Sequence, residues 1–258
     1  MKRRLQERVE QNGGRPLLGL TVTWADPTFI DVVGRIGIDC IWLDQEHTHI
    51  TTTDTHTMCL VANAHDLVKI VRVPGTGRDW ITKTLECGPD VIICPITDTV
   101  EDIEKLVKHS RYRPAGQRGM FSALPSANYA IGGLRAQQFD KIDQQLTVYG
   151  QIESATAVEN LDAMCQVEGI DGFLIGRFDL SADLGVPTQL NHPEVMKLVE
   201  KSVEILRRHG KEVAMLGGPD ELPTFRELGA TFVIISNQTA LIRDSTTRLL
   251  EQCRDQLQ

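Results

Sequence analysis

The sequence predicts a (β/α)8 barrel, and three observations support this fold class. Eight short apolar segments recur along the 258 residues, and stretches with helical periodicity fill the gaps between them. Each segment is hydrophobic at nearly every position, as expected for parallel strands that are covered on both faces. A chain of ~250 residues also has the usual length of such a barrel. Residues 1–258 are therefore expected to form a single barrel domain.

The predicted strands begin with "LLGLTV" and end with "TFVIIS". A doubly wound open sheet is the structural alternative, although it seldom needs eight strands. No Gly-x-Gly-x-x-Gly motif opens a helix after the first strand, so nothing supports a dinucleotide site. The eight predicted strands are residues 17–22, 39–44, 67–73, 90–95, 146–153, 171–176, 211–216 and 231–236.

The clearest helical pattern covers residues 192–210, where Pro193 stands near the start, apolar residues recur at helical spacing and Gly210 marks the end. Residues 99–111 place their apolar side chains on one face, with acidic residues early and basic residues late, which suits the helix dipole. Further helices are predicted at residues 27–37, 219–230 and 238–256.

One connection is much longer than the others. Residues 110–145, between the fourth and fifth predicted strands, are rich in Gly, Pro and Ser. Long connections in compact domains are often functional loops that cover a site. We therefore expect this segment to act as a lid.

The composition excludes several classes of partner. The net charge is −8 and the basic residues are dispersed, so nucleic acid is not an expected ligand. No run approaches ~18 apolar residues, so no membrane span is expected. The basic group at Lys2, Arg3 and Arg4 is followed by polar residues and does not resemble a signal peptide. The cysteines lack a CxxC pair, which predicts buried free thiols in a reducing cytoplasm; they are residues 40, 59, 87, 94, 165 and 253.

Two carboxylates are predicted to form a metal site. In a barrel of this kind the chemistry gathers at the carboxyl ends of the strands, where Glu153 ends the fifth strand and Asp179 follows the sixth. They are 26 residues apart, about one βα repeat, so they should share one rim. Two hard oxygen ligands suit Mg²⁺ or Mn²⁺. Alternatively, each carboxylate caps a helix or pairs with a surface lysine, and "FDLSADLG" around Asp179 also reads as a turn.

A basic group and a cation are predicted at the same rim. His47 lies close to Asp44, the last residue of the second strand, and a carboxylate that holds one imidazole nitrogen leaves the other free as a base. Arg72, at the end of the third strand, can balance negative charge that develops on a substrate. The alternatives are a loop histidine that is hydrogen-bonded to a neighbour and an arginine that is a structural partner of Glu46 or Glu86.

His49 raises the possibility of a zinc hydrolase, because "HTH" could present two imidazoles on one face. Such a site needs further His or Asp ligands from later strands. The later strands end on Glu153 and Asp179, and the other histidines fall in predicted helices or at their edges. His49 is therefore expected to be a bystander.

Several motifs together resemble the metal-dependent pyruvate aldolases of the HpcH/HpaI class. "WLDQEH" resembles the D-x-E-H motif of that family. "KIVRVPG", "RYRPAGQRG", "YGQIESATAVENLDAM" and "VEGIDGFLIGRFDLSADLG" follow in the family's order and approximate spacing. The similarity extends from about residue 17 to residue 245, nearly the whole chain.

The resemblance implies a pyruvate/phosphoenolpyruvate-type barrel whose last helix is exchanged between subunits, in a hexamer built as a trimer of dimers. It implies reversible cleavage of a 4-hydroxy-2-keto acid to pyruvate and an aldehyde. The cofactor would be Mg²⁺ or Mn²⁺, with Co²⁺ as a further possibility. No Schiff-base lysine is required, and none of the predicted strands ends on lysine.

Site residues are carried over only where the motifs match. Glu153 and Asp179 match the metal ligands, Arg72 the arginine near the keto oxygen, and His47 with Asp44 the base dyad. The remaining expected contacts are with substrate and lie close to strand ends; they are Gln151, Gly176, Arg177, Phe178, Leu216 and Trp24.

The chain departs from the family pattern at several places, one of them Trp24 in "TVTWADP", near the rim of the first strand. "GRFD" replaces the usual Gly-Pro before the ligand Asp, so Arg177 and Phe178 crowd the substrate pocket. The segment "RGMFSALPSANY" lacks an arginine that is common there, and Glu86 stands where a shorter Asp is common. The aldehyde therefore stays open, and so do two alternatives: a related lyase or decarboxylase acting on oxaloacetate or an acyl-CoA, and a non-catalytic oligomeric barrel.

Overall fold

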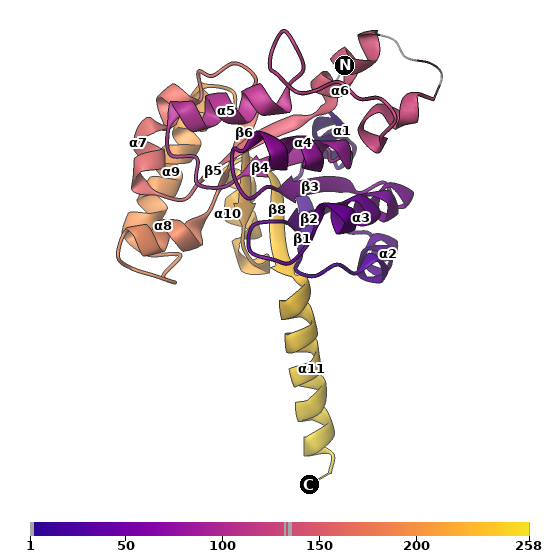
Figure 1. Ribbon diagram of the computed structural model, residues 1–258. Coiled ribbons are helices and arrows are strands. Elements are labelled where there is room, and N and C mark those ends of the chain that lie inside the picture. The colour runs from indigo at the N-terminus through magenta and orange to yellow at the C-terminus, as the bar shows by residue number, and fades with distance from the viewer. Residues whose placement is uncertain (1–2, 132, 134–135, 258) are drawn as a thin grey trace.

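Eight parallel strands close into a barrel in the computed structural model, which describes residues 3–131, 133 and 136–257 (Figure 1). Each strand pairs with its successor, and β8 pairs back onto β1 with Gly19 opposite Ile234. This confirms the predicted fold class. The strands are β1 Leu17–Val22, β2 Cys40–Asp44, β3 Val68–Arg72, β4 Val91–Cys94, β5 Thr147–Ile152, β6 Gly172–Ile175, β7 Glu212–Leu216 and β8 Ala230–Asn237.

Alternate residues of each strand serve two different cores. Trp42 of β2 and Ile70 of β3 lie in the cluster that fills the barrel interior. Leu43 and Val71, their neighbours in the chain, lie in an outer cluster. Side chains alternate between the two faces of a strand, so a strand with apolar residues throughout is buried on both. This explains why the strand segments were recognisable in the sequence.

Helices surround the barrel, and the predicted ones are found at their expected places. Their starts are capped: Thr99 and Asp102 form a capping box at α5, and Asp26 accepts from two backbone N–H groups at α2. The helices are α1 Arg4–Gln11, α2 Pro27–Ile36, α3 Thr52–Ala64, α4 Arg78–Glu86, α5 Val100–Ser110, η1 Pro125–Ala130, α6 Ala136–Gln145, α7 Ala155–Met164, α8 Arg177–Asp183, α9 Pro193–Arg208, η2 Pro219–Glu221, α10 Leu222–Glu227 and α11 Gln238–Asp255.

Helix α1, which the sequence did not predict, closes the amino-terminal end of the barrel. Its Leu5 is fully buried in the interior cluster. Arg3, just before the helix, pairs with Asp171 and with Glu212 at 2.7 Å. Tyr149 donates its hydroxyl to the same Glu212 at 2.9 Å. Lys2 of the basic group noted in the sequence lies outside the described residues.

The long connection does not cover the carboxyl-terminal rim, so the prediction of a lid over that rim is wrong for this chain. Helix α6 lies at the opposite end of the barrel from α8 (Figure 1). Arg118 and Ser126 both bind Glu86 at the end of α4, at 3.2 Å and 2.6 Å. Helix α5 has already returned the chain to the amino-terminal end before this segment begins, so the segment packs there. Residues 132, 134 and 135 of the segment lie outside the described part.

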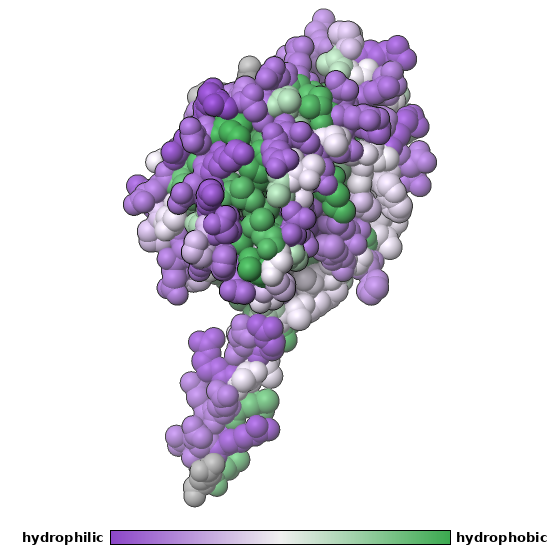
Figure 2. All heavy atoms as spheres, turned by 90° about the vertical axis from the view of Figure 1, so that its left-hand side faces the viewer, coloured by the Kyte–Doolittle hydropathy of each residue, from purple (hydrophilic) through white to green (hydrophobic). Residues whose placement is uncertain are grey.

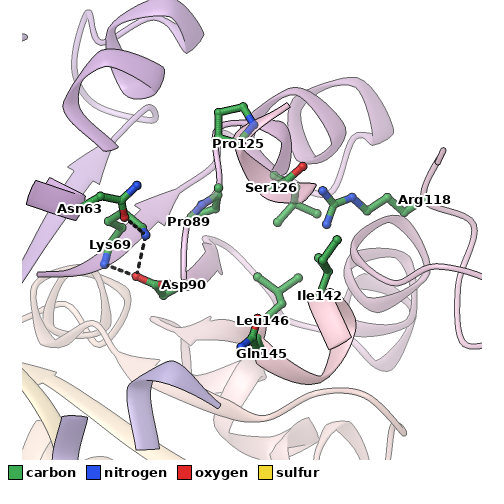
Figure 3. Close-up of a pocket in the computed structure, with 12 residues that line it drawn as sticks. Asn63, Lys69, Pro89, Asp90, Arg118, Pro125, Ser126, Ile142, Gln145 and Leu146 are labelled. Carbon is green, nitrogen blue, oxygen red and sulfur yellow. Dashed lines mark hydrogen bonds and ion pairs between the residues drawn. The ribbon is translucent and has the colours of Figure 1, made fainter. Parts of the chain in front are cut away.

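A cavity of about 230 Å³ lies between this segment and the barrel (Figure 3). Its two cationic side chains are engaged. Lys69 donates to Asn63 at 2.6 Å and lies 3.3 Å from Asp90, and Arg118 stacks on Tyr112 besides binding Glu86. The rest of its lining mixes polar side chains such as Ser126 and Gln145 with apolar ones such as Leu85 and Ile142. We therefore interpret this cavity as part of the scaffold and not as a ligand site.

Helix α11 projects from the barrel at the carboxyl-terminal side (Figure 1), and it carries apolar atoms along part of its length (Figure 2). Ile242, Leu249 and Leu250 are exposed on it. Its first residue, Gln238, is buried and accepts from the N–H groups of Thr23 and Trp24. The exchange of this helix between subunits stays a prediction. Among the described helices, none combines the length and the apolar character needed to cross a bilayer.

Candidate active site

The carboxyl-terminal ends of the strands surround a cavity of about 270 Å³. This is the rim at which the sequence predicted the chemistry. Its lining is aromatic and aliphatic on one part and ionisable on another, as in many small-molecule sites. The lining residues are Thr21, Trp42, His47, Arg72, Gln151, Gly176, Arg177, Phe178, Asp179, Leu190, Leu216 and Gly217.

Arg72 and Asp44 form a buried, bidentate ion pair at this rim. The two residues are in register at the ends of β3 and β2. Arg72 donates from Nε and Nη2 to the two Asp44 oxygens at 2.9 Å and 2.6 Å, and its Nη1 lies 3.1 Å from Glu46. Burial alone lowers the pKa of Arg72, but the hydrogen bonds and charge of Asp44 raise it above its ordinary value. The guanidinium is therefore a fixed cation, packed 4.9 Å from the Trp42 ring.

The structure does not form the predicted dyad of Asp44 and His47. Both Asp44 oxygens accept from Arg72, and Oδ1 also accepts from the Glu46 N–H. The His47 Nε2 instead lies 3.6 Å from the Glu46 carboxylate, and the imidazole is 63% exposed. Arg72 donates two charge-assisted hydrogen bonds to the Asp44 carboxylate, which is a stronger arrangement than one hydrogen bond with His47. Glu46 takes the place that Asp44 was expected to have. His49 is exposed, as expected for a bystander.

Glu153 is a buried carboxylate that is held by neutral donors. The backbone N–H of Ile96 donates to its Oε1 at 2.7 Å, and Gln151 Nε2 donates to its Oε2 at 2.6 Å. Burial raises the pKa of Glu153 above its ordinary value, and the charges of Asp179 and Glu46 raise it further. The hydrogen bond from Ile96 and the charge of Arg72 lower it, but they do not cancel the shift. Burial also raises the pKa of Glu46, although Arg72 and His47 oppose the shift. Arg72 is shared by Asp44 and Glu46, and the other arginine of the cavity, Arg177, pairs with Glu221, so neither one lies in an ion pair with Glu153.

Asp179 stands in the first turn of α8 and is exposed towards the mouth of the cavity. Gly176, immediately before the helix, lies against the Glu153 carboxylate. A Cβ at this position would lie 3.2 Å from Glu153 Oε2 and 3.1 Å from Gln151 Nε2. A side chain at this position would therefore crowd the carboxylate of Glu153 and the amide of Gln151.

Two carboxylates from neighbouring βα units fit a hard divalent cation. Mg²⁺ and Mn²⁺ accept few protein ligands and complete their shells with water and substrate oxygens. The described residues contain no group of three or more His, Cys, Asp or Glu side chains placed to hold a metal. The donors are all oxygen, which suits these ions better than zinc. The buried Oε1 of Gln151 has no protein partner, which leaves a further oxygen beside Glu153.

Of the other predicted substrate contacts, all except Trp24 line the cavity. Gln151, Leu216 and Phe178 line the cavity, and Phe178 is 62% exposed at its edge. Arg177 also lines it, but its guanidinium is engaged by protein groups. Trp24 is 40% exposed and is not among the described residues that line the cavity.

Sequence reasoning missed several residues of the site. Ile96 has a positive φ of 50°, a strained conformation for a β-branched residue, and this conformation accompanies its N–H bond to Glu153. No local sequence signal marks it. Trp42 and Leu190 line the cavity. The alternation within β2 could have placed Trp42 on the inner face, the same face as Asp44.

The match to a family model decides the relationship. The model of the HpcH/HpaI aldolase/citrate lyase family matches residues 17–244, which is most of the chain. The protein belongs to the HpcH/HpaI aldolase/citrate lyase family. It is therefore a carbon–carbon lyase of the aldolase type, and the aldolases of this family depend on a divalent metal.

Individual members of the HpcH/HpaI family show the same relationship over the whole length. The 2-keto-3-deoxy-L-rhamnonate aldolase of Escherichia coli K12 is 30% identical over 238 residues, which cover 92% of this chain and 88% of the relative. Among solved structures, the citrate synthase SbnG superposes with a TM-score of 0.86 at 26% identity, covering 96% and 97% of the two chains. An HpcH/HpaI aldolase from Desulfitobacterium hafniense DCB-2 has a TM-score of 0.89 at 23% identity, covering 95% of each chain, and this supports the fold.

Proposed function

We propose that this member of the family reversibly cleaves a 4-hydroxy-2-keto acid to pyruvate and an aldehyde, with its divalent metal held by Glu153 and Asp179. The observation that carries this proposal is the surplus of carboxylates at a rim where Arg72 is already shared by Asp44 and Glu46 and Arg177 is already paired with Glu221. Burial, and after it the charges of Asp179 and Glu46, raise the pKa of Glu153, and a cation at this place would favour its charged form.

Mg²⁺ and Mn²⁺ fit the two carboxylates best, and Co²⁺ is a further candidate. When bound, such an ion supplies Lewis-acid stabilisation of negative charge on the oxygens of a 2-keto acid. Glu153 is held in place for this role by Ile96 and Gln151. The backbone at Gly176, the position before α8, is free of side-chain bulk and can approach the substrate carboxylate.

The side chains of the rim account for the remaining chemistry. His47 accepts the proton of the C4 hydroxyl while the C3–C4 bond breaks, and the C4–O bond becomes the aldehyde carbonyl. The electrons of the broken bond pass into the enolate of pyruvate, whose oxygen charge Arg72 stabilises. Protonation at C3 then gives pyruvate. Glu46, which contacts both residues, orients the imidazole and the guanidinium.

The relatives support two kinds of substrate. The Escherichia coli relative is an aldolase for 2-keto-3-deoxy-L-rhamnonate, a 2-keto acid. The likeness to the citrate synthase SbnG favours a second candidate, carbon–carbon bond formation with another keto acid on the same rim. Oxaloacetate is the simplest probe for this second candidate.

The deciding experiment measures pyruvate release from a panel of 4-hydroxy-2-keto acids, beside oxaloacetate, before and after treatment with EDTA. Activity should disappear on chelation and return with Mg²⁺, Mn²⁺ or Co²⁺, and the most effective ion identifies the working metal. Activity that survives full chelation and is trapped by borohydride would contradict the proposal, because it would indicate a Schiff-base mechanism.

We also propose a homo-oligomer, a hexamer built as a trimer of dimers, in which α11 packs on a neighbouring subunit. The exposed Ile242, Leu249 and Leu250 on the projecting helix support this. A cytoplasmic location is supported by six unpaired cysteines, five of them buried and Cys253 exposed. Light scattering of the full chain tests the subunit count.

A further inference from the structure

We propose that Arg177 is the wall that limits the length of the aldehyde in the catalytic cavity. The inference rests on the proposed function, because it concerns the aldehyde half of that reaction. Arg177 is the first residue of α8, directly after Gly176 and two positions before Asp179. Its side chain is 2% exposed, so it is buried beside the site and is not a surface charge.

The guanidinium of Arg177 is held from three sides. Nη1 lies 2.6 Å from Glu221 and donates to Asn191 at 3.1 Å, while Nη2 donates to the carbonyl of Leu216 at 2.9 Å. Its Cζ stacks 5.0 Å from the Phe225 ring. These partners come from β7, from the α8–α9 connection, and from η2 and α10. A side chain with so many bonds is fixed before the substrate arrives, so it acts as a rigid boundary.

Arg177 lines two cavities. One is the catalytic cavity of about 270 Å³, which Leu190 and Leu216 also line. The other is a cavity of about 320 Å³, which Met196 and Phe225 also line. In this proposal the aldehyde end of the substrate points towards Arg177, and the second cavity is the space that becomes accessible when this side chain is shortened.

The lining of the second cavity predicts which aldehydes could use it. Met196 and Phe225 offer apolar contact, whereas Asp220 and Glu221 place carboxylates at its edge. If Arg177 were removed, Glu221 would lose its cation and the joined space would repel an aldehyde that ends in a carboxylate. The wild-type protein should therefore prefer short aldehydes, and a variant without this wall should gain long, uncharged ones.

The test uses the full-length, metal-loaded protein in the direction of synthesis, with pyruvate and the series acetaldehyde, propanal, pentanal and hexanal. The measured quantity is the ratio of kcat/KM for hexanal to that for propanal. Arg177→Ala should raise this ratio at least about tenfold, because apolar contact of added methylene groups discriminates by about this factor or more. Glutaraldehydic acid, which carries a terminal carboxylate, should gain less than hexanal.

Two further variants separate the wall from other effects. Arg177→Met keeps most of the bulk but not the charge, so the ratio should stay near that of the wild type. Arg226→Ala removes an exposed arginine of α10 that lines neither cavity, and it controls for the loss of a positive charge. A rise with Arg177→Met as large as that with Arg177→Ala would overturn the proposal.

The wild-type protein alone also tests the inference, even if Arg177→Ala does not fold. Equal use of hexanal and propanal by the wild type would show that no wall limits the aldehyde. Exchange of the C3 protons of pyruvate in D2O, followed by NMR, tests the proposed function separately. Absence of metal-dependent exchange contradicts the aldolase itself, whereas exchange without any length preference contradicts only the role of Arg177.

Discussion

The two ends of the barrel use charged residues in opposite ways. At the amino-terminal end, the buried Arg111 pairs with Asp171 at 2.7 Å, and Arg3 binds both Asp171 and Glu212, so cations and carboxylates are matched. At the carboxyl-terminal rim, Asp44 and Glu46 share Arg72, while Glu153 and Asp179 lie in no ion pair among the described residues.

This difference separates stability from function within one fold. Matched charges with further hydrogen bonds keep the closed end of the barrel together. Unmatched carboxylates at the open end repel one another and cost folding free energy, which a bound cation recovers. Substitutions at the two ends should therefore have different consequences, and the following predictions test this.

The largest effect is expected for Glu153→Ala at the open end. Turnover should fall by about 1000-fold or more, because a bound metal contributes several kcal/mol to transition-state stabilisation. The free energy of unfolding without metal should not decrease, because burial and the neighbouring carboxylates disfavour the charged form of Glu153. Pyruvate release, metal titration calorimetry and urea unfolding measure the three quantities.

Glu159→Ala, which removes an exposed glutamate of α7, is the matched control and should change none of them. A Glu153→Ala variant that binds metal and turns over normally would show that the rim carboxylates are not the metal site. It would also remove the basis of the comparison between the two ends.

The next largest effect is expected for Arg111→Ala at the closed end. This variant should lose free energy of unfolding, whereas its turnover should not change. Arg111 donates to the carbonyls of Leu146 and Gly169 at 3.0 Å and 3.1 Å, besides its pair with Asp171. Breaking such a buried pair costs about 3 kcal/mol. Urea unfolding should show this loss, while kcat at a temperature where the variant is folded should match the wild type.

Arg35→Ala provides the comparison for a solvent-exposed pair, because Arg35 binds Asp31 on the surface of α2. It should change stability very little, since exposed ion pairs are screened by water and salt. A similar stability for both arginine variants would contradict a special role of the closed end.

The smallest effect is expected for Glu212, whose shifted pKa should make the stability of the protein depend on pH. Burial raises the pKa of Glu212, although Arg3, Tyr149 and Gln6 oppose the shift. The folded state therefore holds this proton at a pH where the unfolded carboxyl has lost it. The stability that this bound proton contributes is fully present below pH 4.5, the pKa of the carboxyl in the unfolded chain. It is lost as the pH rises through the higher pKa of the folded state.

Glu212→Gln removes this dependence. Compared with the wild type, its relative stability should improve between pH 4.5 and pH 7, as measured by urea unfolding at several pH values. Glu200→Gln, at an exposed position of α9, corrects for the change in overall charge. A difference between wild type and Glu212→Gln that is the same at every pH would show that burial does not shift this carboxyl.

Several features could be predicted from the sequence because they depend on local pattern. The strands are buried on both faces, so their apolar runs mark them within one or two residues. Arg72, Glu153 and Asp179 were identified because strand ends in such a barrel meet at one rim. Helix α1 was missed because Leu5 and Val9 are its only apolar residues, too weak a periodic signal in eight positions.

Only the tertiary structure decided which of these side chains contact each other. The sequence placed Asp44 near both His47 and Arg72, and the register of β2 with β3 gave its carboxylate to the arginine. Arg177 meets Glu221 only because β6 and β7 are neighbours in the barrel. The position of the long connection at the closed end, by contrast, follows from the order of the elements, because the predicted helix at residues 99–111 precedes it. Local pattern specifies where an element begins and ends, whereas the partners of a polar side chain depend on residues that are distant in the chain.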